Sequence, residues 1–287
     1  MARIALLTLE DRTGYVIDDA LAIDELRSRG HEVDEVPWSR PGADWSAYAL
    51  VVVRTPWDYT ERPDAFLDVL AEIEAGGVPL ENRRSVVGWN LHKGYLRELE
   101  QQGVPIVPTT WGRGADSLRA VRARMSGRFV VKPVIGANAR DTFVIDASEG
   151  DAAMQHVAAV YASREWMAQP FVRSVVEDGE HSLFYFSGVL SHAIVKSPAR
   201  GDFRVQEEHG GMVRPIEPPA ELRAAADRVL RSLPEPLLQA RIDLVRLDDG
   251  TPALMEAELI EPSLYFRMHL DAPRNFADAV EARLKSS

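Results

Sequence analysis

Residues 238–266 read LQARIDLVRLDDGTPALMEAELIEPSLYF, with an apolar run on each side of Asp-Asp-Gly-Thr. Asp-Gly between apolar runs is a strong short-range signal for a β-hairpin. A two-residue turn at Asp249 and Gly250 places Asp243 directly opposite Glu256. Because side chains alternate between the two faces of a strand, Glu258 shares the face of Glu256. The stretch therefore predicts a hairpin that carries three carboxylates on one patch of sheet.

Two readings of this acidic patch are open. Like charges that lie opposite each other repel, so a buried cluster of carboxylates needs a cation. Hard oxygen ligands in this number suit Mg²⁺ bridged to the phosphate oxygens of a nucleotide. In the other reading the three are ordinary carboxylates on the wet face of a sheet, since acidic residues are mostly exposed.

The composition is that of a globular protein with a sizeable core. The chain has 287 residues, of which 46% are hydrophobic and 27% charged. The net charge of −11 and the lack of a basic block argue against a nucleic-acid partner. There is no cysteine, which excludes disulfides, thiolate nucleophiles and cysteine metal sites. No run of about 18 apolar residues and no signal-peptide pattern occurs, so a cytoplasmic protein without a membrane span is expected.

The first part of the chain alternates predicted strands with predicted helices. The strands are residues 3–9, 31–36, 49–53 and 78–81, and the helices are residues 17–29 and 63–75. This alternation predicts a small parallel α/β sheet, in which ligands bind beyond the carboxyl ends of the strands. Arg54 and Asp58 follow the third strand at that edge, where we expect them to bind the charged groups of a substrate. The alternative is a structural loop with Trp57 packed into a groove.

The remainder of the chain has an α+β pattern. Besides the hairpin, it predicts helices at residues 87–102, 116–125, 151–162, 220–233 and 276–284, and strands at 128–134, 143–146, 182–186 and 189–196. Lys132 lies inside an apolar strand, where a lysine is costly unless its charge is paired. The small residues of 136–142 either place backbone N–H groups around phosphates or form a plain hairpin.

The motifs of the chain, taken together and in order, resemble the ATP-grasp superfamily. They are Lys93, VVKP around Lys132, the small-residue loop, MAQPFV, DGEH, FRVQEEHGG, IDL, MEAEL and EP. The resemblance covers essentially the whole chain and is closest to the branch of bacterial glutathione synthetase and the ribosomal-protein glutamate ligases. RTPWDY and ELIEPSLYF are further similar to a subgroup that includes the O-ureidoserine cyclo-ligase of cycloserine biosynthesis.

The resemblance implies the ATP-grasp fold, with α/β and α+β parts. The implied units are a parallel α/β N-terminal domain, a connecting helix and strand, a lid subdomain, and a catalytic subdomain built on an antiparallel sheet with helices. Their expected ranges are residues 1–85, 86–109, 110–172 and 173–287.

The resemblance also assigns residues to the nucleotide. Lys93 and Lys132 correspond to the two lysines that hold the phosphates of ATP. Gln169 lies in the hinge, where backbone groups of Phe171 and Val172 would read the adenine edge. In the lid loop the implied contacts are Gly136, Ala137 and Asn138. Glu180 corresponds to the carboxylate that accepts the ribose hydroxyls, and Gln206 stands where relatives usually carry asparagine.

Catalytic and metal-binding roles follow in the same way. Arg204 and Lys132 correspond to the groups that neutralise the transferring phosphoryl group. Asp243, Glu256 and Glu258 correspond to the metal ligands. The third ligand of the family is usually asparagine, so Glu258 adds a negative charge. The residues expected to contact the substrate are Arg54, Asp58 and Ser263.

The implied activity is that of an ATP- and Mg²⁺-dependent carboxylate–amine ligase. It would form an amide-type bond on a small amino acid or amino-acid derivative through an acyl phosphate, and release ADP and phosphate. One alternative is an intramolecular cyclo-ligase of the O-ureidoserine type. Alternatives of another class are a nucleotide-binding protein without ligase activity and an ATP-grasp phosphotransferase. One or two Mg²⁺ ions are expected, and Mn²⁺ is an alternative ion. The expected partner is a small amino-acid-like molecule. A homo-oligomer is a further alternative to a single chain.

Overall fold

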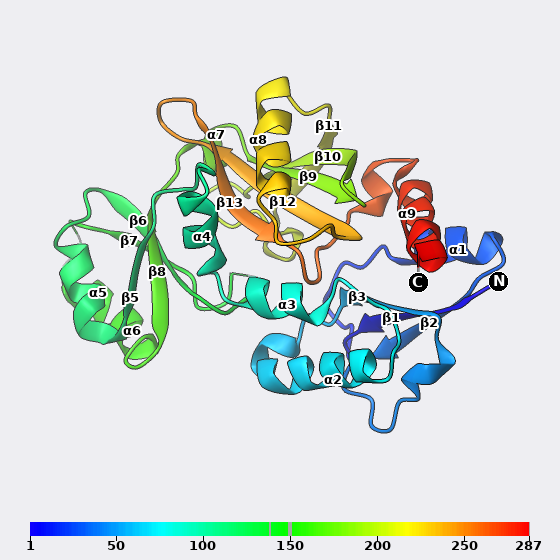
Figure 1. The fold of residues 1–287 in the computed structure, drawn as a ribbon. Coiled ribbons are helices and arrows are strands. Elements are labelled where there is room, and N and C mark those ends of the chain that lie inside the picture. Colours follow the sequence, from blue (N-terminus) through cyan, green and yellow to red (C-terminus); the bar gives the residue numbers. More distant parts are fainter. Residues whose placement is uncertain (138, 149–150, 287) are drawn as a thin grey trace.

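The fold is built on three β-sheets (Figure 1). Residues from the parts of the chain that form these sheets line one central cavity. The computed structural model describes residues 1–137, 139–148 and 151–286. Each sheet is formed by strands that are close together in the sequence. The residues that the sequence assigns to one site therefore come from three separate parts of the chain.

The N-terminal sheet is parallel, with the strand order β2-β1-β3-β4. Its elements are β1 (Arg3–Thr8), α1 (Ala20–Ser28), β2 (Glu32–Pro37), β3 (Leu50–Thr55), α2 (Pro63–Ala75) and β4 (Leu80–Glu81). Ile4 and Leu6 of β1 pack into one core and Ala5 and Leu7 into another, because successive side chains point to opposite faces. Both faces are covered, which explains why the strands read as continuous apolar runs.

The second sheet is antiparallel and lies at the left in Figure 1, with the order β5-β8-β6-β7. It consists of β5 (Thr110–Arg113), α5 (Gly114–Arg122), β6 (Arg128–Pro133), β7 (Phe143–Asp146), α6 (Asp151–Val160) and β8 (Glu165–Pro170). Leu118, Phe129, Val131 and Trp166 form its small core. Edge strand β5 was not predicted, because its sequence TWGR carries no alternating apolar pattern.

The third sheet is antiparallel, with the order β11-β10-β9-β12-β13. Its elements are α7 (Ser174–Glu177), β9 (Glu180–Phe186), β10 (Val189–Ser197), β11 (Met212–Ile216), α8 (Ala220–Arg231), β12 (Gln239–Arg246), β13 (Pro252–Glu258) and α9 (Ala272–Ser286). Edge strand β11 was missed as well, since it is largely exposed and contains Pro215. Short 3-10 turns occur at η1 (Trp45–Ala47), η2 (Tyr59–Glu61), η3 (Glu207–His209) and η4 (Phe266–Met268).

A shared core joins the first sheet to the third. It includes Ile4 and Leu50 from the first sheet, Phe184 and Phe186 from the third, and Phe276 from α9. In Figure 1 helices α1 and α9 lie side by side next to the first sheet. This packing joins the parallel first sheet to the antiparallel third sheet.

The long helix expected at residues 87–102 is two helices, α3 (Arg84–Leu91) and α4 (Tyr95–Gln101). They are separated at Lys93, whose backbone N–H donates to the Val134 carbonyl at 2.8 Å. The next N–H, of Gly94, donates to Nδ1 of His92 at 3.0 Å. The interruption brings the Lys93 side chain into the central cavity.

Hairpin β12–β13 pairs Asp243 with Glu256, which confirms the predicted partners. The expected two-residue turn is wrong, however. The Leu247 N–H donates to the Thr251 carbonyl at 2.9 Å, so the loop contains three residues. Gly250 closes it with φ +84°, a left-handed conformation that glycine adopts without strain. This turn alone would shift the strand pairing by one residue.

A bulge in β13 restores the pairing. Leu244 is opposite Leu254, whereas the preceding residue Asp243 is opposite Glu256. Met255 is thus the extra residue on β13, and its side chain lines the cavity. The alignment of Asp243 with Glu256 therefore depends on both the longer turn and the bulge.

Candidate active site

One cavity lies between the three sheets and holds most of the residues that the sequence singles out. Fourteen of them line it: Lys93, Lys132, Gly136, Ala137, Gln169, Phe171, Val172, Glu180, Arg204, Gln206, Asp243, Glu256, Glu258 and Ser263. Asn138 lies outside the described residues. Arg54 and Asp58 are not among the residues that line this cavity in the described ranges. The roles of the fourteen stay predictions, but their assembly in one place is a finding.

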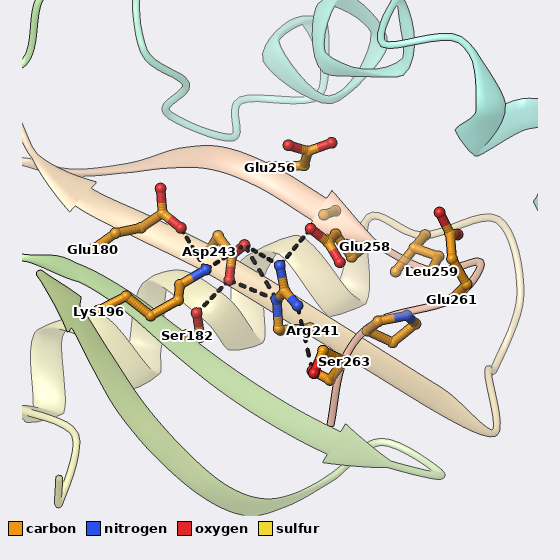
Figure 2. A network of polar contacts seen from close by, with 12 residues as sticks. Glu180, Ser182, Lys196, Arg241, Asp243, Glu256, Glu258, Leu259, Glu261 and Ser263 are labelled. Atoms are coloured by element: carbon orange, nitrogen blue, oxygen red, sulfur yellow. Dashed lines mark hydrogen bonds and ion pairs between the residues drawn. The ribbon is translucent and has the colours of Figure 1, made fainter. Parts of the chain in front are cut away.

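Asp243 is at the centre of a buried polar network on the third sheet (Figure 2). Its carboxylate accepts hydrogen bonds from Ser182 Oγ at 2.6 Å, Arg241 Nη2 at 3.0 Å and Lys196 Nζ at 3.3 Å. Burial would raise the pKa of Asp243, but Arg241 and Lys196 outweigh it and lower the pKa to about 2. Asp243 is therefore ionised and held in place by two cations.

Glu256 is paired with Lys93 across the cavity wall. Burial opposes ionisation of Glu256, yet the charges of Lys93 and Lys132 lower its pKa. Lys132 itself lies with Nζ 3.8 Å from Sδ of Met255. Burial lowers the pKa of Lys132, and the Glu256 charge opposes this shift. The charge of Lys132, which projects from the apolar strand β6, is thus partly balanced by Glu256 on the third sheet.

Glu258 forms an ion pair with Arg241, the residue opposite it in the β12–β13 pairing (Figure 2). Burial raises the pKa of Glu258 to about 8, although Arg241 lies beside it. Arg241 on the neighbouring strand offsets the charge that Glu258 adds, relative to the usual asparagine of the family, when Glu258 is ionised.

The acidic patch is charge-compensated and is not a preformed metal cage. Among the described residues, no group of three or more His, Asp or Glu side chains is arranged to hold a metal ion. Asp243, Glu256 and Glu258 each face a cationic side chain, and their role as metal ligands stays a prediction. Their chemistry nevertheless fits Mg²⁺, since all three offer carboxylate oxygens to the same cavity.

The loop after β10 contributes Arg204 and Gln206. Arg204 Nη2 is 2.7 Å from Oδ2 of Asp202, so the side chain is held within its own loop. Oε1 of Gln206 is buried and has no hydrogen-bond partner in the described part of the chain. Glu180, expected to accept ribose hydroxyls, lines the cavity with its carboxylate 2.6 Å from Lys196 Nζ.

The hinge segment after β8 carries backbone groups that can form hydrogen bonds with a ligand. The Phe171 N–H donates to the Arg128 carbonyl and the Val172 carbonyl accepts from Val175 N–H. Within the described residues, no hydrogen bond involves the Phe171 carbonyl or the Val172 N–H. One acceptor and one donor are therefore left side by side at the cavity edge. Gln169 is fixed by a 2.9 Å hydrogen bond from its Nε2 to Thr109 Oγ1.

The prediction that Arg54 binds the substrate is wrong. Its side chain is 1% exposed and makes a bidentate contact with Asp19. Its Nη1 also donates to the Gln239 side chain at 2.9 Å, and both Nη atoms reach the Pro262 carbonyl. Every polar direction of the guanidinium is occupied by protein groups.

Asp58 does not line the cavity in the described ranges either. Its Oδ1 accepts a 2.7 Å hydrogen bond from Nε1 of Trp38, a buried residue of the first core. Trp57, for which groove packing was the alternative, does line the cavity, and its Nε1 donates to the Glu261 carbonyl at 2.9 Å. The RTPWDY segment thus reaches the cavity through its aromatic rings.

Sequence reasoning did not assign several charged residues of the described cavity lining to the site, and the most buried part of it contains three of these: Lys196, Arg241 and Glu261. The chain has only four lysines, and three of them, including Lys196, line this cavity, a bias that the sequence does contain. Arg241 could have been found from the hairpin, since the same pairing that opposes Asp243 to Glu256 opposes Arg241 to Glu258.

Comparison with known proteins agrees with this arrangement. A family model described as the N-terminal domain of D-cycloserine synthetase DcsG matches residues 4–82. The cycloserine biosynthesis protein DcsG of Streptomyces lavendulae is 35% identical over 304 residues, covering 99% of this chain and 100% of that protein.

Solved structures show the same fold. The crystal structure of D-cycloserine synthetase DcsG matches with a TM-score of 0.87 and 32% identity, over 98% of this chain and 99% of that chain. The ATP-grasp ligase PsnB, in complex with a minimal precursor, Mg and ADP, matches with a TM-score of 0.67 and 16% identity over 98% of both chains. The expected ATP-grasp fold is confirmed.

Proposed function

The chain belongs to the D-cycloserine synthetase DcsG family of ATP-grasp ligases, and from this membership we propose that it closes a ring within one amino-acid derivative. As a member it is an ATP-dependent enzyme that joins a carboxylate to a nitrogen. The finer proposal is that both groups belong to one molecule of the O-ureidoserine type. The observation that carries it is the similarity over 99% of the chain to a protein of cycloserine biosynthesis.

We place the nucleotide between the lid sheet and the third sheet. The open Phe171 carbonyl and Val172 N–H suit the donor and acceptor edge of adenine. Lys93 and Lys132 face the same cavity, where their charges suit the phosphates. On binding, Lys93 would exchange Glu256 for phosphate oxygens. Glu180 at 2.6 Å from Lys196 would likewise have to turn toward the ribose.

Asp243, Glu256 and Glu258 would hold one or two Mg²⁺ ions once Lys93 and Arg241 turn to the anionic ligands. The ion supplies charge stabilisation to the phosphoryl oxygens during transfer. Arg204 and Lys132 add positive charge at that position from the protein side. Together these groups offset the repulsion between a carboxylate nucleophile and the terminal phosphate of ATP.

Trp57, Tyr59 and Ser263 line the end of the cavity that we assign to the substrate. Its aromatic rings would keep water away from an acyl phosphate. Ser263 stays a proposed substrate contact, whereas Arg54 supports this end from behind through the Pro262 carbonyl.

Several further features belong to the same proposal. The ranges 1–85, 110–172 and 173–287 serve as structural units, since each of the three sheets is formed within one of them. No helix in the described ranges is long and apolar enough to cross a membrane. A cytoplasmic location, a small-molecule partner of amino-acid type and an open oligomeric state remain part of the proposal.

Incubation with O-ureido-D-serine, ATP and MgCl₂ tests the function. We expect ADP, phosphate and a cyclic product in equal amounts, measured by coupled assays and mass spectrometry, and little turnover of the L-enantiomer. A linear amide that forms only after addition of a separate amine would refute ring closure but retain the ligase. A phosphorylated product that accumulates without amide formation would favour the phosphotransferase.

A further inference from the structure

Seven carboxylates of the described residues line the cavity, and they differ in how their charge is compensated. Five have a cationic partner: Glu180, Glu207, Asp243, Glu256 and Glu258. Glu208 is exposed to solvent. Glu261 is partly buried and forms no ion pair with any described residue. Among the described residues it is therefore the sheltered cavity carboxylate without an ion-pair partner.

The backbone around Glu261 is fixed on both sides. The Glu261 carbonyl accepts from Trp57 Nε1 at 2.9 Å, and the Pro262 carbonyl accepts from Arg54 at 3.2 and 3.3 Å. The Ser263 carbonyl accepts from Arg241 Nη1 at 3.3 Å. Three consecutive carbonyls are thus held by side chains of the first and third sheets, which gives the Glu261 side chain a defined position.

That position is on the loop after β13, in the lining of the cavity. Figure 2 shows the Glu261 side chain just beyond the end of β13, past Leu259. Facing it are the Tyr59 hydroxyl from η2, Glu256 from β13 and Lys93 from the α3–α4 break. Burial raises the pKa of Glu261 to about 7, and Glu256 adds to the rise; Tyr59 and Lys93 act in the opposite direction.

We propose that Glu261 is the proton acceptor for the nitrogen that attacks the acyl phosphate. This role rests on the proposed ligase function. As the nitrogen lone pair forms the new N–C bond, the C–O bond to phosphorus breaks and phosphate leaves with that electron pair. The nitrogen carries one hydrogen more than the amide product allows, and this proton passes to a carboxylate oxygen of Glu261. No oxidation or reduction takes place, and the proton returns to solvent after product release.

The other cavity carboxylates are less suited to this task. Asp243, Glu256 and Glu258 are proposed metal ligands. Glu180 is paired with Lys196, and Glu207 is paired with Arg267. Glu208 is exposed, so its basicity is that of an ordinary carboxylate in water. A carboxylate with a pKa near the working pH accepts a proton more effectively than one that is strongly stabilised as an anion.

Glu261→Gln separates this role from activation of the carboxylate. Two rates are measured with O-ureido-D-serine, ATP and Mg²⁺: formation of the cyclic product, and formation of a hydroxamate when hydroxylamine is added to trap the acyl phosphate. Because hydroxylamine is largely neutral at pH 7 and supplies its own nucleophilic nitrogen, trapping does not need Glu261. We expect ring formation to fall at least about 100-fold, while trapping stays within about threefold of wild type.

The pH profile and a matched variant complete the test. Wild-type kcat should decline below about pH 7, and this acid limb should be absent in Glu261→Gln. Glu208→Gln removes an exposed carboxylate of the same cavity and should change neither rate. If Glu261→Gln does not fold, Glu261→Asp replaces it and should keep the acid limb with a lowered kcat.

Two results would overturn the assignment alone. One is Glu261→Gln with near wild-type ring formation and an unchanged acid limb. The other is a folded variant that loses trapping together with ring formation, which would make Glu261 a residue of activation. A wild-type enzyme that yields neither hydroxamate nor cyclic product contradicts the proposed function itself, and with it the role of Glu261.

Discussion

Arg54 and Asp19 form a buried bidentate ion pair, with Nη2–Oδ1 at 2.8 Å and Nε–Oδ2 at 3.0 Å. Their side chains are 1% and 6% exposed. Through Gln239 and the Pro262 carbonyl, Arg54 also connects the end of β3 to the third sheet. The pair therefore belongs to the contact between the first and third sheets.

Replacement of Arg54 by Met should destabilise the protein. Removal of one partner of a buried ion pair leaves an uncompensated charge, here Asp19, which typically costs roughly 3–5 kcal/mol. Urea unfolding of Arg54→Met should show this loss, whereas Arg3→Met, which removes an exposed pair with Asp34, should change little. A variant of normal stability with a raised Michaelis constant for the amino-acid substrate would instead restore the substrate role of Arg54.

Lys132→Met tests the phosphate site. The substitution keeps an apolar stem in β6 and deletes the charge, so ATP affinity should fall more than tenfold, which is about 1.4 kcal/mol. Isothermal calorimetry with Mg-ATP gives the comparison, and Lys285→Met near the C-terminus provides a control at a lysine far from the cavity lining. Unchanged ATP binding would make Lys132 a structural lysine.

Glu256→Gln tests the proposed metal site. Turnover should be abolished with a melting temperature close to wild type, because a glutamine of the same size can still fill the position next to Lys93. Asp248→Asn in the turn of the same hairpin is 79% exposed in its side chain and should retain full activity. Phosphate release at a near wild-type, Mg²⁺-dependent rate would remove Glu256 from the mechanism.

His192 should make the fold acid-sensitive. It stacks on Phe184 at 4.3 Å and hydrogen-bonds to the Leu264 carbonyl. Burial lowers its pKa to about 4. The unfolded chain therefore binds more protons between about pH 6.5 and 4, and stability falls over that window as pH decreases, by up to roughly 3 kcal/mol.

The check is the difference in unfolding free energy between pH 7 and pH 4.5 for wild type and two variants. His192→Asn should show a smaller pH-dependent loss than wild type, although it is less stable at pH 7. His156→Asn, at an exposed histidine, should keep the wild-type slope. Equal slopes for all three proteins would show that His192 does not control the acid transition.

Much of the fold was accessible from apolar periodicity. Helix α2 begins and ends where the sequence predicts, because Pro63 at its start and the Gly-Gly after its end are strong boundary signals. Strand β7 also has the predicted bounds. Edge strands β5 and β11 could not be predicted in this way, because strands with exposed side chains carry no apolar pattern. The break at Lys93 was hidden because it is made by a hydrogen bond to Val134, a residue distant in sequence.

The sequence predicted which residues form the site better than it predicted which residues they contact. Motif order identified the residues that line the cavity, but Arg54 was misassigned because its partners Asp19 and Gln239 lie far from it in the sequence. The pairing of Asp243 with Glu256 was right although the turn was wrong, since the bulge at Met255 offsets the longer loop. Ion pairs such as Arg241 with Glu258 depend on register that single-sequence patterns seldom define.

The most direct test of the central claim follows oxygen from substrate to phosphate. O-Ureido-D-serine labelled with ¹⁸O in its carboxylate is incubated with the enzyme, ATP and Mg²⁺, and the released phosphate is analysed by mass spectrometry. Activation through an acyl phosphate predicts that each phosphate carries one ¹⁸O atom and that the cyclic product retains the other. Cyclic product formed together with unlabelled phosphate would contradict the account.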